Sequence, residues 1–168
     1  MRSNHKTIVL TGMFAALIFV TIFFISIPTG FGGVIHFGDS LIFLAAVMLP
    51  FPYGLVAAGV GAGLFNLVRI PMWFPFTIVI KPIMALCFTS KGETLLGPLR
   101  NKIAPFVAGA LNVVLYFPGY MLLAYPGGWA VAWAAVPGQL VQAGGSIIFF
   151  FILAGALDRL GVKGRFLL

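Results

Sequence analysis

The sequence has very little charge, because only 8% of its 168 residues are Asp, Glu, Lys or Arg, whereas 61% are hydrophobic. A soluble domain carries about 25% charged residues, so this chain cannot cover its surface with polar groups. Soluble enzymes and disordered proteins are therefore excluded, and an integral membrane protein is expected. The single cysteine, Cys87, also excludes an internal disulfide and a metal site built from several cysteines.

Apolar runs separated by loops rich in glycine, proline or charge divide the chain. At about 20 apolar residues per span, this length allows five or six transmembrane helices and no separate soluble domain. The pattern predicts one all-α membrane domain over residues 1–168. Its six spans are expected at about 7–27, 37–50, 53–69, 74–90, 103–124 and 131–158. The second span is short and must tilt or be shielded by its neighbours.

The distribution of basic residues over the two sides of the membrane decides between five and six spans. The sequence has ten basic residues and only three acidic ones. With six spans, both termini and the 91–102 loop share one side, which then carries eight basic residues against Arg69 alone on the other. Merging the second and third runs would divide them three against six. The positive-inside rule favours six spans with both termini cytoplasmic.

Lys81 is the polar residue that most needs an explanation. It lies seven residues from the expected outer end of its span, which is about 10 Å deep at the rise of an α-helix. A lysine at such a depth costs about 2.5–3.5 kcal/mol on insertion scales. It either contacts a ligand, with Thr77 on the same helix face, or forms an ion pair with Asp39. Asp39 has a second interpretation as the N-cap of a helix.

Other polar and aromatic residues belong to the expected outer half of the spans. Buried amides either join helices or contact a ligand, and Arg69 either compensates a helix dipole or contacts a ligand. Tyr116 and Trp133 are expected to face inward. An outward-facing cup with an apolar wall and a few polar groups is the resulting hypothesis. Its candidate substrate-binding residues are Asp39, Asn66, Arg69, Thr77, Lys81, Tyr116, Trp133, Gln139 and Gln142.

Several segments, taken in order, resemble the substrate-binding S component of an energy-coupling factor (ECF) vitamin transporter, over nearly the whole chain. These are Gly12-Met-Phe-Ala-Ala16, His36-Phe-Gly-Asp39, the run 43–54, Gly59-x-x-x-Gly63 with Asn66, and the Thr-x-x-x-Lys of Thr77 and Lys81. The resemblance implies a six-helix bundle in the plasma membrane of a bacterium. Such a bundle captures a vitamin or vitamin precursor on its outer side.

The resemblance also implies partners and a lid. A transmembrane T component and two cytoplasmic ATPase subunits drive release, apparently by tipping the S component in the membrane. Docking is expected through Gly12 and Ala16, where the family has an Ala-x-x-x-Ala face. The loop after the first span is expected to be a lid, with Gly30, Gly32, Gly33 and His36 as its residues.

The ligand and one alternative function stay open at this point. Lys81 and Arg69 favour a carboxylate or a phenolate-like oxygen on the ligand, and the aromatics favour a ring. Pantothenate, pyridoxine-type, pyrimidine, riboflavin and folate-like ligands are all compatible. A stand-alone facilitator or channel is the alternative, although a channel needs a polar path through both halves. No enzyme activity, cofactor, metal or nucleic-acid partner is expected, because no set of nucleophile, base or metal ligands occurs.

Overall fold

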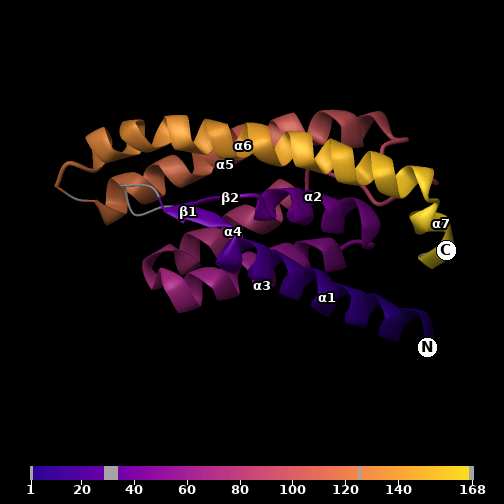
Figure 1. Cartoon of the computed structure of the whole chain (residues 1–168). Helices are drawn as coiled ribbons and strands as arrows, with labels where there is room; N and C mark the ends of the chain where they lie inside the picture. Colours follow the sequence, from indigo (N-terminus) through magenta and orange to yellow (C-terminus); the bar gives the residue numbers. More distant parts are fainter. Residues whose placement is uncertain (1, 29–33, 125, 167–168) are drawn as a thin grey trace.

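Helices running back and forth along one axis build the computed structural model, which describes residues 2–28, 34–124 and 126–166 (Figure 1). A short antiparallel hairpin joins the first two helices, with Ser26 opposite His36. Both termini lie at the same end of this axis (Figure 1). The elements in chain order are α1 (Arg2–Phe24), β1 (Ser26–Pro28), β2 (Val34–His36), α2 (Gly38–Met48), α3 (Tyr53–Arg69), η1 (Pro71–Trp73), α4 (Phe74–Ala85), α5 (Leu99–Leu123), α6 (Gly128–Arg159) and α7 (Val162–Phe166).

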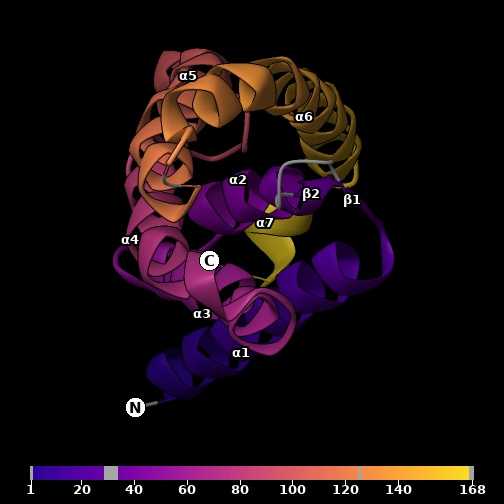
Figure 2. The same ribbon diagram turned by 90° about the vertical axis from the view of Figure 1, so that its left-hand side faces the viewer.

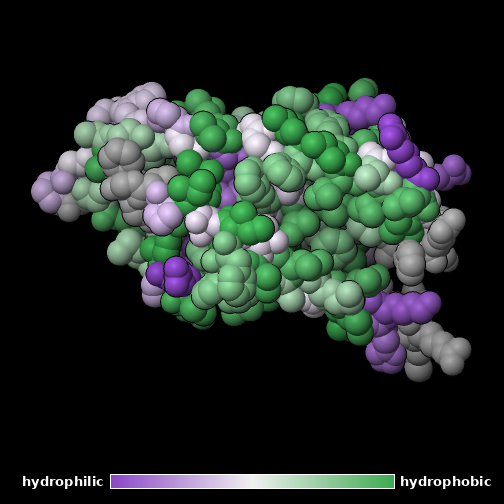
Figure 3. All heavy atoms as spheres, in the orientation of Figure 1, coloured by the Kyte–Doolittle hydropathy of each residue, from purple (hydrophilic) through white to green (hydrophobic). Residues whose placement is uncertain are grey.

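Three of the described helices are long and apolar enough to cross a membrane, namely His5–Phe24 in α1, α5 and α6. The helices α2, α3 and α4 are shorter but also apolar. Hydrophobic residues cover most of the middle of the visible face, and hydrophilic residues gather at the end where the termini lie (Figure 3). This distribution is typical of a chain whose middle is surrounded by lipid.

The short helix α2 lies in the centre of the bundle, with the other long elements around it (Figure 2). Nine of its eleven residues are buried, and Ile42, Phe43 and Val47 have no exposed surface. A helix of eleven residues is about 16 Å long, which is too short to cross the hydrocarbon core of a bilayer. Shielding by neighbouring helices is therefore how the fold accommodates this element.

Glycines on α3 allow three helices to approach one another closely. A Cβ added at Gly61 would lie 2.7 Å from the carbonyl oxygen of Ala15 on α1, and one at Gly59 would lie 3.0 Å from the ring of Pro82 on α4. Small residues at helix contacts let backbones pack closely in the absence of a hydrophobic driving force between membrane helices. The glycine-rich sequence of α3 thus has a packing role.

The helix ends differ from the expected spans at several places, since α1 ends at Phe24, α5 begins at Leu99 and α6 begins at Gly128. α1 begins at Arg2, and α4 ends at Ala85, before the expected end at residue 90. After α4 the chain continues as a loop. The guanidinium of Arg100 donates to the carbonyls of Leu86 and Cys87 at the end of this helix. These carbonyls have no intrahelical partner at the end of a helix, so the arginine satisfies them.

Two side chains from other elements fix the loop between α4 and α5. Asn101 donates to the carbonyls of Thr89 and Leu95 and accepts from the N–H of Thr89. The carboxylate of Asp158, at the end of α6, accepts from the N–H groups of Leu95 and Leu96 at 2.6 and 2.9 Å. The loop is therefore attached to both α5 and α6.

Candidate functional site

A small cavity of about 50 Å³ lies inside the bundle, beside the β1–β2 hairpin. Its wall comes from the hairpin and from α1, α3, η1, α4, α5 and α6, so residues far apart in the sequence meet there. The polar residues that line it are His36, Asn66, Thr77, Lys81, Tyr116, Tyr120, Gln139 and Gln142. Most of the candidate residues expected from the sequence therefore share one site.

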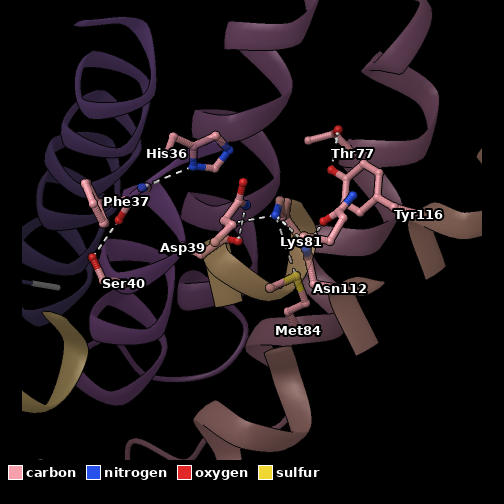
Figure 4. A network of polar contacts seen from close by, with 12 residues as sticks. His36, Phe37, Asp39, Ser40, Thr77, Lys81, Met84, Asn112 and Tyr116 are labelled. Atoms are coloured by element: carbon pink, nitrogen blue, oxygen red, sulfur yellow. Dashed lines mark hydrogen bonds and ion pairs between the residues drawn. The ribbon is translucent and has the colours of Figure 1, made fainter. Parts of the chain in front are cut away.

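An ion pair between Lys81 and Asp39 lies at the centre of the polar residues (Figure 4). The ammonium nitrogen of Lys81 is 2.7 Å from Oδ1 of Asp39, and both side chains are 2% exposed. Lys81 also donates to Oδ1 of Asn112 at 2.9 Å, and Gln142 donates to Oδ2 of Asp39 at 2.8 Å. The interpretation of Asp39 as an N-cap is wrong, since Phe37 occupies that position and no side chain caps α2.

A second chain of hydrogen bonds runs along the same wall (Figure 4). Asn66 donates to the hydroxyl of Thr77, which lies 2.7 Å from the hydroxyl of Tyr116. The ring of Tyr116 has the ammonium nitrogen of Lys81 5.2 Å from its centre. Asn112 donates to Oε1 of Gln139. The polar groups thus connect α2, α3, α4, α5 and α6 through side chains alone.

The charges of the site cancel within the site itself. Lys81 and Asp39 carry opposite charges in direct contact, and burial of an unpaired charge at such a place is costly.

His36, on β2 between the first two helices, accepts from the N–H of Gly38 through Nδ1. The pKa of His36 is lowered to about 4, mainly by burial, while the nearby Asp39 carboxylate raises it and the Lys81 ammonium lowers it. His36 is therefore neutral near pH 7, with its proton on Nε2.

Aromatic rings next to the polar chain also line the cavity. Trp73 packs edge-on against Tyr120, with ring centres 4.5 Å apart, and lies 5.6 Å from Tyr116. A Cβ at Gly119 would lie 2.8 Å from the Trp73 ring, so this glycine leaves room for the indole. The turn at η1, which directs Trp73 inward, has Pro71 as its only sequence signal.

Two of the candidate residues lie away from the cavity. Arg69 is exposed at the end of α3, with its guanidinium 5.0 Å from the centre of the Phe23 ring. Trp133 is 57% exposed and packs edge-on against Phe117 and Trp129, so the expectation that it faces inward is wrong. The physical reason is helix phase: Trp133 precedes Gln142 by nine residues, which is about two and a half turns and hence the opposite face.

The residues expected to form the lid and the docking face lie in different parts of the chain. Gly30, Gly32 and Gly33 lie outside the described residues, whereas His36 lines the cavity. Gly12 and Ala16 are exposed on α1, and a Cβ at Gly12 would meet no atom within 4 Å. Gly12 therefore does not serve close packing within the described part of the bundle.

These features define a mostly helical, multi-pass membrane protein with a small, polar-lined cavity inside its bundle. The family described as ECF-type riboflavin transporter, S component, matches residues 2–159, and the chain belongs to this family. It is thus the S component of an ECF transporter, a transport subunit and not an enzyme. Membership implies a substrate and T and A components as partners. A Pyrococcus woesei protein, described as an uncharacterized protein in gap 3'region, is 36% identical over 122 residues, covering 69% of this chain and 76% of that protein.

Proposed function

We propose that this S component captures an uncharged aromatic ligand of the riboflavin type. The observation that carries the proposal is the pairing of Lys81 with Asp39, which leaves the cavity without net charge. A carboxylate ligand would need an unpaired cation, and Arg69 is exposed outside the cavity. The expectation of an acidic ligand therefore loses its support.

The chemistry of the wall supports a planar ring with a polar edge. Trp73, Tyr116 and Tyr120 offer faces and edges to an aromatic system, for which such contacts contribute about 0.5–1.5 kcal/mol each beyond area. Gln139 and Gln142 carry amides that both donate and accept. The isoalloxazine ring of riboflavin is planar and neutral, and its imide edge requires donors and acceptors side by side.

The size of the cavity implies that binding includes an opening movement. Ligand pockets enclose about 300–1,000 Å³, whereas this cavity encloses about 50 Å³. The wall must therefore separate before a vitamin fits. The β1–β2 hairpin is a short element of the wall, made of two paired strands of three residues each between the ends of α1 and α2. It is the segment proposed to move.

The orientation and docking proposals rest on different features. Six spans with cytoplasmic termini agree with the gathering of Lys6, Lys102 and Arg159 at the end where the termini lie, while Arg69 ends α3 at the other. Docking of a T component on α1 is supported by the exposed pair Gly12 and Ala16, since small residues four apart allow another helix to approach closely.

Riboflavin fluorescence tests the ligand directly. The purified protein in detergent is titrated into riboflavin, and quenching on binding gives the dissociation constant. Gln142→Leu should weaken binding by about tenfold or more, which is the scale of one buried hydrogen bond with an unsatisfied partner. Leu140→Ala, on the exposed face of the same helix, is the matched control. Binding of biotin or pantothenate in place of riboflavin would refute an uncharged ligand.

A further inference from the structure

A second and larger hollow, with a lining that shares no residue with the proposed ligand site, lies toward the end of the bundle where both termini lie. It encloses about 460 Å³ between the α2–α3 turn, the end of α4 and the start of α5. Its floor is apolar, with Leu49, Leu55 and Phe88 among the lining residues. This volume lies within the range of about 300–1,000 Å³ that small-molecule sites enclose.

The rim of this hollow is polar and basic on one side. Thr89, Ser90, Lys91 and Arg100 line it, and both basic side chains are exposed. Glu93, the acidic residue of the same loop, is not among the lining residues. The hollow therefore combines an apolar floor with an edge that attracts an anion.

Arg100 is held at this rim by bonds that leave most of its donors free. Its Nε donates to the carbonyl of Cys87 at 2.8 Å, and one Nη donates to the carbonyl of Leu86. A guanidinium has five N–H groups, so three remain for an outside acceptor. Arginine with paired N–H groups matches the oxygens of a phosphate.

The loop that carries Lys91 is also fixed in place. The backbone N–H of Lys91 donates to the hydroxyl of Thr89, and the carbonyl of Ser90 accepts from Lys163 of α7 at 2.8 Å. Asn101 holds Thr89 on its other side. The rim is thus built before any ligand arrives, which reduces the entropy cost of binding.

We infer that this hollow binds an anionic phospholipid, with the phosphate at Lys91 and Arg100 and the start of an acyl chain on the apolar floor. Phe51 and Leu86, at its edge, are 73% and 46% exposed, so the apolar surface continues outward to the lipid around the bundle. Basic pockets between transmembrane helices near the membrane surface are suited to acidic headgroups. The site is independent of the ligand proposed above.

Retention of lipid by the purified protein tests this inference. The wild-type protein is reconstituted in nanodiscs of phosphatidylcholine with 30% phosphatidylglycerol and then extracted. The mass of the protein with its retained lipid is measured by native mass spectrometry. One tightly held phosphatidylglycerol per chain is expected. Because one basic residue at a membrane surface corresponds to about fivefold in affinity, Lys91→Gln should reduce retention about fivefold. Arg100→Lys, which keeps the positive charge but loses the paired N–H groups of the guanidinium, should also reduce lipid retention.

Lys102→Gln is the matched control, since this lysine is exposed on the same end of the bundle outside the hollow. Equal loss in Lys91→Gln and Lys102→Gln, or equal retention of phosphatidylcholine and phosphatidylglycerol, would overturn the site. Equal thermal stabilisation by inorganic phosphate and by phosphatidylglycerol would also overturn it in favour of a soluble anion. If Phe51→Ser and Lys91→Gln reduce recovery of the T component while lipid retention is unchanged, the hollow is a protein interface and the inference is refuted.

Discussion

Removal of Lys81 should destabilise the protein even when no ligand is present. A lysine ammonium has three donors, and here they are directed at Oδ1 of Asp39 at 2.7 Å, Oδ1 of Asn112 at 2.9 Å and the sulfur of Met84 at 3.8 Å. All three point at protein atoms on α2, α4 and α5. Lys81 therefore connects helices in the absence of a ligand, and its donors are directed at protein atoms.

The magnitude follows from burial of the pair. Lys81→Met leaves the Asp39 carboxylate buried with Gln142 as its remaining partner among the described contacts. Breaking a buried ion pair by removing one member costs about 3–5 kcal/mol, because the other charge stays uncompensated. We expect this loss of unfolding free energy for Lys81→Met and a comparable loss for Asp39→Asn. The double variant should lose less than the sum, since it leaves no buried charge.

The assay is equilibrium unfolding in mixed micelles, followed by tryptophan fluorescence without ligand. Lys102→Met, an exposed lysine on α5, is the control and should stay within about 0.5 kcal/mol of wild type. If Lys81→Met also stays within that range while riboflavin binding is lost, the structural tie is refuted. Lys81 is then an anchor for the ligand alone.

Three further predictions concern other parts of the molecule. Gly61→Leu should cost about 1–3 kcal/mol in the same unfolding assay, because its Cβ would lie 2.7 Å from the Ala15 carbonyl; an unchanged stability would mean that α1 and α3 separate freely. Gly12→Leu should keep stability and riboflavin affinity but abolish co-purification with the T component, and joint loss of affinity would instead indicate internal packing. Ligand-free stability should fall between pH 6.5 and about 4, since unfolded chains protonate His36 where the folded protein does not. His36→Gln should remove this slope, and a slope that survives in the variant would assign it to another group.

The sequence could predict the membrane class, and it named Asp39, beside a ligand, as one of two candidate partners of Lys81, because those conclusions depend on composition and on scarcity. Only three acids exist, so Asp39 was an obvious candidate for a buried lysine. The order of motifs predicted the family, which the match over residues 2–159 confirms. Composition and motif order can be determined without knowledge of how each helix is rotated.

Helix rotation is what the sequence could not give. A mostly apolar helix carries little polar pattern from which its rotation can be determined, and in α6 this pattern is limited to a few residues such as Gln139 and Gln142. Trp133, which is expected to face inward, is exposed, whereas Gln142 on the opposite face lines the cavity. The η1 turn that brings Trp73 to the cavity depends on tertiary packing, so the sequence does not indicate the position of this side chain.

The unequal lengths of the helices give the bundle two hydrophobic thicknesses. α6, with 32 residues, is about 48 Å long, whereas α4, with 12 residues, is about 18 Å long. A hydrocarbon core of about 30 Å matches neither of them when the bundle stands upright. Because mismatch is relieved by tilt at a modest cost per ångström, we expect the resting orientation of this subunit to follow the thickness of the bilayer around it. A thicker membrane then favours the upright bundle and a thinner one the inclined bundle.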